Sequence, residues 1–235
     1  MLDSFRALVN GGPDWAMNAL PNPILLAVLA VVIAVFSYFL GCSNGAIIVS
    51  KYILHNDVRN HGSGNAGLTN FHRVFGGKLT LVVILSDVVK AIVAICLALF
   101  AVWLVGWPGL SVGAKYWAGL WCLLGHMFPC MFGFKGGKGI LSGGAIAIMM
   151  DWRIFVIGFS LFLIIVFATH YVSLGSILAA TAYAVLFVIF FPGQPWIWSI
   201  AIAMAVLAIF MHRSNIARLL HGTETKTYLL KSKKK

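Results

Sequence analysis

The chain has 235 residues, of which 61% are apolar and only 10% are charged, and its mean hydropathy is +0.96. A chain of this composition lacks the polar surface that a soluble globule needs, so the composition excludes a soluble protein and predicts an integral membrane protein. The formal net charge is +11. On a membrane protein such a charge indicates orienting loops, contact with anionic membrane lipids or anionic substrates, and nucleic acid is not expected as a partner.

The chain opens with a mixed segment that is broken by glycine and proline. This segment, residues 1–23, lacks the basic start and the small-residue cleavage site of a signal peptide, so we expect the first apolar run to remain as a span. The orientation derived below makes residues 1–23 an extracytoplasmic segment. One membrane domain is expected at 24–222, followed by a basic cytoplasmic tail at 223–235.

Seven apolar runs predict an all-α, polytopic fold. A helix needs about 20 mostly apolar residues to cross the hydrocarbon core. Six runs meet this length and the run at 140–150 is short, which suits a span that is partly walled by other helices. The runs are 24–42, 79–105, 113–132, 140–150, 154–171, 174–192 and 195–212.

The basic residues predict the orientation of these spans. Seven spans would place ten or more of them on one side: Lys51, Arg59, Arg73, Lys78, Lys135, Lys138, Arg213, Arg218, Lys226 and the terminal KSKKK. The other side would receive only Arg6, Lys115 and Arg153. Cytoplasmic loops carry the excess of Lys and Arg, so the N-terminus is expected outside and the C-terminus in the cytoplasm. Six spans would divide the basic clusters between the two faces.

The loop after the first span, HGSGNAGLTNFHR at 61–73, has the composition of an oxyanion site. Glycine accepts the positive φ angles that let consecutive backbone N–H groups turn inward, and arginine adds a bidentate phosphate contact. A flexible polar linker is the alternative. The candidate residues are Gly62, Ser63, Gly64, Asn65, Gly67, Thr69, Asn70 and Arg73.

A second glycine-rich segment, GHMFPCMFGFKGGKGI at 125–140, ends at the start of an apolar run. Its backbone N–H groups, a helix dipole and two lysines are suited to an anion. The nucleotide-binding pattern GxxxxGK[ST] is absent, so ATP hydrolysis is poorly supported. A positively charged loop with turn glycines is the alternative, and His126 could be a packed structural residue. The candidates are His126, Lys135, Gly136, Gly137, Lys138 and Gly139.

Two weaker signals follow later in the chain. In HRSNIARLL at 212–220, helical spacing keeps His212 and Asn215 on one face. In YVSLGS, Ser173 and Ser176 are three residues apart, where serines usually cap helices.

Ionisable residues inside the apolar runs need a partner. Asp87 and Lys90 lie three residues apart in the second run, as either a structural ion pair or a pair that supports a site. The four cysteines have no metal-ligand spacing and are interpreted as packing residues, and no metal or organic cofactor is expected.

Taken in order, GSGNAGLTNFHR, D-x-x-K, GHMFPCMFGFKGGKG, YVSL and HRSNIARLL with Gly222 and Glu224 resemble the signatures of the bacterial acyl-phosphate:glycerol-3-phosphate acyltransferases over about residues 36–222. One departure is GCSN at 41–44, where the family has GSIP, so either Cys42 or Ser43 stands where the family serine would be. That position is left out of the candidate site.

The resemblance implies an enzyme of phospholipid biosynthesis in the bacterial inner membrane, with its site at the cytoplasmic face. It would transfer an acyl group from acyl phosphate to the 1-hydroxyl of glycerol 3-phosphate, forming lysophosphatidic acid and phosphate. Its partners would be these two substrates and membrane lipids, with a functional link to other phospholipid-synthesis enzymes. The resemblance assigns the catalytic roles by position to Ser63, Arg73, Lys138, His212 and Asn215.

Two questions stay open at this level. The general base is His212, His126 or a phosphate oxygen of the donor itself, because no His-x4-Asp pattern is present. The alternative functions are a transporter of a small organic phosphate and a structural protein with a lipid-binding surface. A transporter would usually place charge at the membrane midplane and show two related halves.

Overall fold

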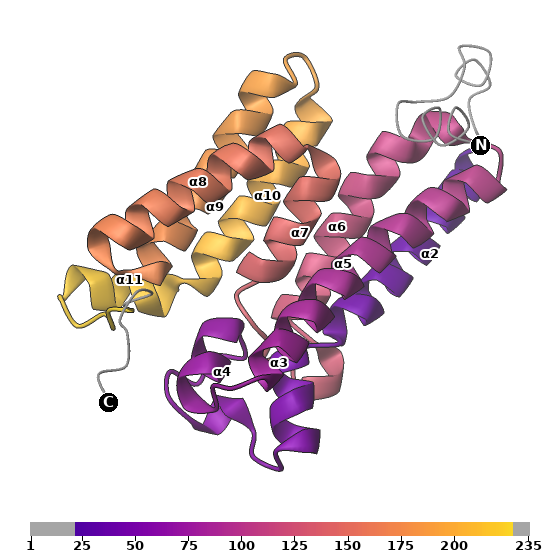
Figure 1. Cartoon of the computed structure of the whole chain (residues 1–235). Helices are drawn as coiled ribbons and strands as arrows, with labels where there is room; N and C mark the ends of the chain where they lie inside the picture. Colours follow the sequence, from indigo (N-terminus) through magenta and orange to yellow (C-terminus); the bar gives the residue numbers. More distant parts are fainter. Residues whose placement is uncertain (1–21, 228–235) are drawn as a thin grey trace. The chain divides into compact units, whose positions relative to one another are not determined.

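The computed structural model describes residues 22–227. The predicted N-terminal segment therefore lies almost entirely outside the described residues, as does most of the predicted basic tail. The described chain forms two compact units, one ending at Met150 and the other beginning at Asp151 (Figure 1). We describe each unit by itself.

The first unit is built from long apolar helices joined by short helical segments. It contains α2 (Pro23–Cys42), α3 (Gly45–Ile48), the π-helical turn η2 (Val49–Ile53), η3 (Val58–Asn60), α4 (Leu68–Val74), α5 (Leu79–Leu104), η4 (Pro108–Leu110), α6 (Ser111–Met127), η5 (Cys130–Phe132) and α7 (Ile140–Met150).

Two glycines allow α2 and α6 to pack closely. A Cβ atom at Gly41 would collide with the backbone of Cys122, and one at Gly125 would collide with the carbonyl of Tyr38. Small residues at a crossing bring helix backbones together where lipid supplies no hydrophobic driving force. Helix α5 packs on both α2 and α6, and α7 packs on α5 and α6, so the end of α6 and the start of α7 share one scaffold (Figure 1).

A small apolar core supports the segments that follow α2. Ile47, Val58, Phe71 and Val83 are fully buried and come from four different elements of the first unit. The polar loops around them are therefore anchored to α5 and are not loose linkers.

The second unit contains three long helices and one short one: α8 (Trp152–Thr169), α9 (Val172–Phe190), α10 (Pro195–Met211) and α11 (Arg213–Leu220). Helix α9 packs against α8, α10 and α11, and the chain bends by 57° between α10 and α11. The bend lies at His212, one of the predicted site residues.

The predicted all-α fold is confirmed for the described residues. Four helices are long and apolar enough to cross a membrane, and the bent pair of α10 and α11 makes a fifth candidate. Large apolar side chains such as Ile24, Phe36 and Leu104 are exposed on the helices, as lipid-facing residues are. Helices α6 and α7 are shorter, so the seven spans and their orientation stay predictions. One predicted boundary was wrong: the apolar run at 113–132 was expected to form a single span, but the helix α6 ends at Met127.

Candidate functional site

The first predicted loop is held together by the side chain of Asn70. The Oδ1 atom of Asn70 accepts the backbone N–H of Ser63 at 2.9 Å. Its Nδ2 atom donates to the carbonyls of His61 and Asn65 at 3.0 and 3.1 Å, and to that of Val58 at 3.2 Å. Asn70 is buried and sits on α4, so one amide fixes the path of the whole loop.

The glycines of this loop have the predicted conformation. Gly62 and Gly64 have φ angles of +58° and +70°, which confirms that the loop turns through the left-handed region. Ser63 lies between them and is exposed, and Arg73 is exposed in the last turn of α4. The loop thus exposes the side chains of Ser63 and Arg73, while the amide of Asn70 fixes its backbone. Gly67 is the N-cap of α4, and Asn65 and Thr69 lie beside it.

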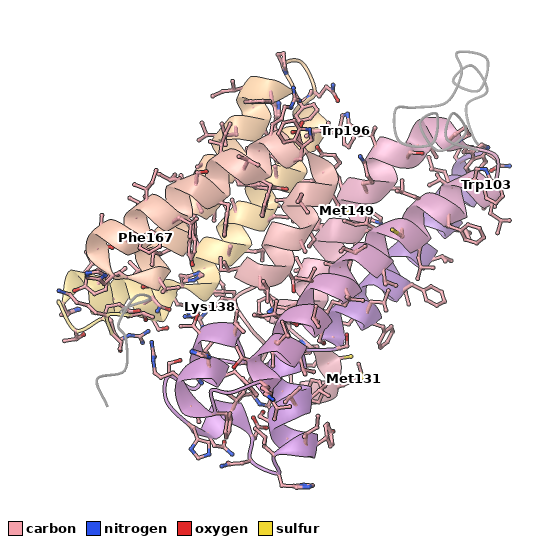
Figure 2. The ribbon with its side chains drawn as sticks, in the orientation of Figure 1. Trp103, Met131, Lys138, Met149, Phe167 and Trp196 are labelled. Carbon is pink, nitrogen blue, oxygen red and sulfur yellow. The ribbon has the colours of Figure 1, made fainter. Side chains whose placement is uncertain are left out.

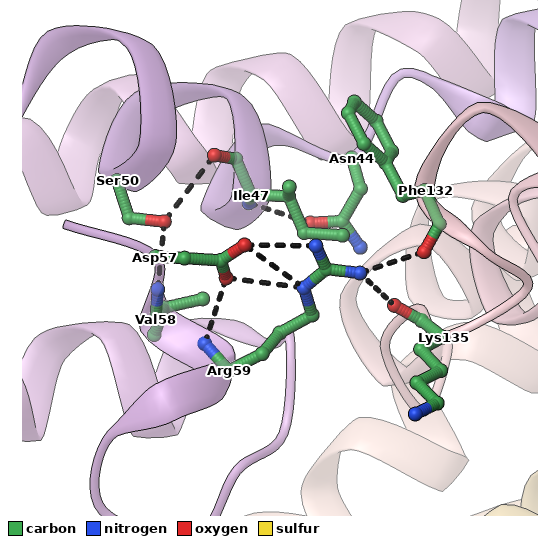
Figure 3. Close-up of polar contacts among 8 residues, drawn as sticks. All are labelled: Asn44, Ile47, Ser50, Asp57, Val58, Arg59, Phe132 and Lys135. Atoms are coloured by element: carbon green, nitrogen blue, oxygen red, sulfur yellow. Dashed lines mark hydrogen bonds and ion pairs between the residues drawn. The ribbon is translucent and has the colours of Figure 1, made fainter. Parts of the chain in front are cut away.

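Arg59 connects the segment just before the first loop to the second loop (Figure 3). The guanidinium of Arg59 pairs with Asp57, with its Nη2 atom 2.8 Å from Oδ2, and its Nη1 atom donates to the carbonyl of Phe132 at 2.7 Å and to that of Lys135 at 3.3 Å. The hydrogen bonds from Arg59 hold the pKa of Asp57 below its usual range. Arg59 therefore links residues 57–59 to Phe132 and to the beginning of the FKGGKG segment.

The second predicted loop folds back along the end of α6. The N–H of Gly136 donates to the carbonyl of Met127, and that of Gly137 to the carbonyl of His126, both at 3.1 Å. Gly137 is buried, and a Cβ atom there would collide with Nε2 of His126 and lie 2.7 Å from the carbonyl oxygen of Ala66. Lys138 follows on the loop before α7 (Figure 2) and is half-buried, whereas Lys135 is exposed. Gly139 has a φ of +77°.

A buried network of three ionisable side chains, those of Asp87, Lys90 and His126, contacts this loop. The Nζ atom of Lys90 is 2.8 Å from Oδ1 of Asp87, 2.8 Å from Nδ1 of His126 and 3.0 Å from the carbonyl oxygen of Ser43. All three side chains are nearly inaccessible to solvent. The same Oδ1 accepts the N–H of Gly45 at 3.3 Å. The pair of Asp87 and Lys90 therefore contacts the junction of α2 and α3 and the histidine at the start of the second loop, which favours the site-supporting interpretation.

The segment that departs from the family pattern serves as part of this scaffold. The Oδ1 of Asn44 caps α3 by accepting the N–H of Ile47, and its Nδ2 donates to the carbonyl of Ala66 in the first loop, both at 3.1 Å. Asn44 is fully buried. It connects the end of α2 to the first loop through its amide.

In the second unit, Glu224 accepts hydrogen bonds from two of the predicted residues, Ser173 and Asn215. Glu224 Oε1 accepts hydrogen bonds from Ser173 Oγ and Asn215 Nδ2, both at 2.8 Å, and Oε2 accepts one from Arg218 Nε at 2.7 Å. Although partial burial acts to raise it, these hydrogen bonds hold the pKa of Glu224 below its usual value. Glu224 thereby connects the start of α9 to one face of α11.

The remaining predicted residues of this unit are also ordered. His212 is buried at the bend, and its Nδ1 lies 2.7 Å from the carbonyl oxygen of Ala208. Since a carbonyl oxygen only accepts, the Nδ1 atom of His212 carries a hydrogen. Ser176 donates to the carbonyl of Val172. The hydroxyl groups of Ser173 and Ser176 thus donate hydrogen bonds within the unit, and each would have to rotate to donate one to a substrate.

The predicted residues fall into two groups, one in each unit. Residues 62–73 and 126–139 share the scaffold of the first unit, and residues 173–176 and 212–215 lie around Glu224 and the bend in the second. Sequence reasoning missed Asn44, Asp57, Arg59 and Glu224 as scaffold residues, although Glu224 stands in the last matched motif. Within residues 22–227, no His, Cys, Asp and Glu side chains gather in a group that could hold a metal ion.

Most of the chain matches one known protein family. The profile of the glycerol-3-phosphate acyltransferases matches residues 31–222. A protein of this name from Thermoanaerobacter sp. (strain X514) is 39% identical over 197 residues, which is 84% of this chain and 95% of that protein. Another, from Neisseria meningitidis serogroup B, is 37% identical and covers 81% of this chain and 93% of its own length.

Solved structures give the same result. The chain is similar to crystal structures of PlsY, an integral membrane glycerol 3-phosphate acyltransferase. The glycerol 3-phosphate form has a TM-score of 0.75 and 34% identity, and the lysophosphatidic acid form has a TM-score of 0.72 and 33% identity. Each alignment covers 86% of this chain and 96% of the solved chain.

Proposed function

We propose that this chain, which belongs to the glycerol-3-phosphate acyltransferase family, takes its fatty acyl group from an acyl phosphate and transfers it to the 1-hydroxyl of glycerol 3-phosphate. Acylation of glycerol 3-phosphate is the activity that its relatives share, and the chain is an enzyme of this class. The relatives' names do not contain the donor, so the donor, the position of the ester and the roles of single residues form the proposal.

One observation carries the proposal: two glycine-rich loops, each with cationic side chains, are fixed on one scaffold. Asn70 fixes the first loop, and Arg59 and the backbone of α6 fix the second. Backbone N–H groups and cations that need no reorganisation are what a phosphate and a developing oxyanion require. A transporter would not need its cationic groups held at loops of this kind, and its support from the sequence is weaker than that of the enzyme.

In the proposed reaction the substrate supplies the base. The 1-hydroxyl oxygen of glycerol 3-phosphate attacks the acyl carbonyl carbon, and an ester bond forms as the bond between that carbon and the phosphate oxygen breaks. The hydroxyl proton passes to an oxygen of the leaving phosphate. A mixed anhydride has a good leaving group, so correct placement of the two reactants supplies much of the rate enhancement.

The assigned residues would share the work by charge and position. By their positions in the family motifs, Ser63, Arg73, Lys138, His212 and Asn215 would bind the phosphate of glycerol 3-phosphate. The loop at 136–139, with Ser173 and Ser176, would bind the acyl phosphate. This arrangement requires the predicted topology of seven spans, with both loops and α11 at the cytoplasmic face of the inner membrane.

Donor identity is tested with the purified full-length protein in detergent. We expect lysophosphatidic acid to form from labelled glycerol 3-phosphate and acyl phosphate, but not with acyl-CoA or acyl carrier protein as donor. Turnover with a thioester donor and none with acyl phosphate would contradict the proposed donor and leave the acceptor assignment intact.

The substrate-assisted step is tested by comparing His212→Ala with Lys138→Ala. Both are expected to raise the KM for glycerol 3-phosphate and to leave kcat nearly unchanged, because both would bind its phosphate equally in the ground state and in the transition state. A large loss of kcat confined to His212→Ala, with the acceptor KM unchanged, would instead identify His212 as a general base.

A further inference from the structure

The environment of His126 settles a question that the sequence leaves open. His126 and His212 are the two histidines of the candidate site, and the sequence leaves both open as the general base. Its ring is in contact with Lys90, and its own backbone carbonyl holds the loop at 136–139. The hydrogen bonds around Lys90 determine where the ring carries its proton.

Lys90 has three hydrogens and three partners. Two of these partners, Oδ1 of Asp87 at 2.8 Å and the carbonyl oxygen of Ser43 at 3.0 Å, can only accept. The third partner is Nδ1 of His126 at 2.8 Å. An ammonium group satisfies all three contacts if Nδ1 offers its lone pair, whereas an N–H at Nδ1 would face the third hydrogen of the ammonium.

The competing arrangement places the extra proton on the imidazole and leaves Lys90 as a neutral amine. Asp87 favours the proton on Lys90 because its Oδ1 lies 2.8 Å from Nζ of Lys90 but 3.6 Å from Nδ1 of His126. A buried carboxylate is stabilised by the charge that lies closer to it.

We propose that Lys90 holds His126 as a neutral imidazole with its hydrogen on Nε2, and that His126 is a positioning residue for the glycine loop and not the general base. With Nδ1 occupied by Lys90 and Nε2 protonated, the ring has no lone pair to receive the proton of a hydroxyl group.

The network reaches both ends of the loop that it positions. At the near end, the carbonyl of His126 accepts the N–H of Gly137, and the ring fills the space below Gly137. At the far end, Ser142 in the first turn of α7 donates its hydroxyl to the carbonyl of Asp87 at 3.1 Å. Asp87, Lys90 and His126 thus fix where Lys138 leaves the scaffold, although none of them needs to touch substrate.

The test reads the proton directly and needs no turnover. Full-length protein with ¹⁵N-labelled histidine is studied by NMR in detergent near neutral pH, and the signals of His126 are assigned by their loss in His126→Gln. We expect an unprotonated Nδ1 and a protonated Nε2. His212 is an internal control with a protonated Nδ1, because that atom faces the carbonyl of Ala208. A protonated Nδ1 on His126 would overturn the assignment.

Kinetics separates positioning from proton transfer. A glutamine amide offers one acceptor and one donor as the ring does, but it cannot take up a proton. We therefore expect His126→Gln to retain kcat within about tenfold of the wild type and His126→Ala to lose more. A folded His126→Gln protein as inactive as His126→Ala, with a loss of about 10² to 10⁴, would show that the ring acts as a base. The positioning role bears on the proposed acyl transfer, but the NMR result stands even if another acyl donor is used.

Discussion

Removing the carboxylate of Glu224 is expected to loosen the second unit and to weaken acceptor binding together. Glu224 receives hydrogen bonds from Ser173 and Asn215, both of which are buried, and it pairs with Arg218. In Glu224→Ala the two buried donors lose their acceptor, and Asn215 is no longer held in the orientation that we propose for phosphate binding.

The magnitude follows from the three contacts. A hydrogen bond to a charged acceptor contributes about 1.5 to 3 kcal/mol, and donors that lose this acceptor recover part of that from other partners. The side chain of Arg218 is 36% exposed, so its ion pair adds less than about 1 kcal/mol. We expect Glu224→Ala to lower the free energy of unfolding by about 3 kcal/mol, or the melting temperature by about 6 to 12 °C. The acceptor KM should rise about tenfold, which corresponds to about 1.4 kcal/mol.

The assay combines thermal unfolding in detergent, followed by tryptophan fluorescence, with steady-state kinetics at varied glycerol 3-phosphate. Arg218→Ala is the matched control, since it removes only the exposed partner and should change the melting temperature by no more than about 4 °C. If Glu224→Ala kept the melting temperature and the acceptor KM of the wild type, the contacts of Glu224 would have no energetic role and the reasoning would be refuted.

Three further outcomes are expected. Because the pKa of Glu224 is lower in the folded protein than in the unfolded chain, its carboxylate stabilises the fold fully above about pH 4.3. This stabilisation is lost as the pH falls through the folded pKa, so the melting temperatures of the wild type and Glu224→Gln should converge in acid. A difference in melting temperature that does not change with pH would contradict this. Arg59→Lys should lower kcat/KM about tenfold, because an ammonium cannot reach Asp57 and the carbonyls of residues 132 and 135 together. Unchanged kcat/KM in this variant would show that these contacts of Arg59 do not position the second loop. Gly137→Ala should lose more than about 100-fold in kcat/KM since its Cβ has no space, whereas Gly113→Ala, with nothing within 4 Å, should not; equal activities of the two variants would disprove the close fit.

The apolar helices could be predicted closely from the sequence because bilayer burial depends on local hydropathy. Helices α2 and α5 begin and end within one residue of the predicted runs. The end of α6 was missed for a physical reason: residues 128–132 are as apolar as a span, but Pro129 has no N–H to continue the helix and the chain turns into η5. Hydropathy alone does not detect such a turn.

The glycine-rich loops were also predictable as turns, whereas their supports were not. Positive φ angles at Gly62 and Gly64 follow from the residue type. Arg59, however, binds backbone carbonyls 73 and 76 residues away, and Ser173 meets Glu224 across 51 residues. Every residue has a carbonyl, so no sequence pattern marks the one that an arginine will reach.

The shortness of α7 has a consequence for what holds it in place. Its 11 residues cover about 16 Å, roughly half of the hydrocarbon thickness. The preceding loop doubles back, so a Cβ atom at Gly139 would lie 2.5 Å from a methyl group of Leu123, a full turn before the end of α6. Of the residues of α7 only Ile148 is exposed, and the helix packs on α5 and α6. Contacts with protein, and not with lipid, therefore fix the point where the FKGGKG segment enters its helix.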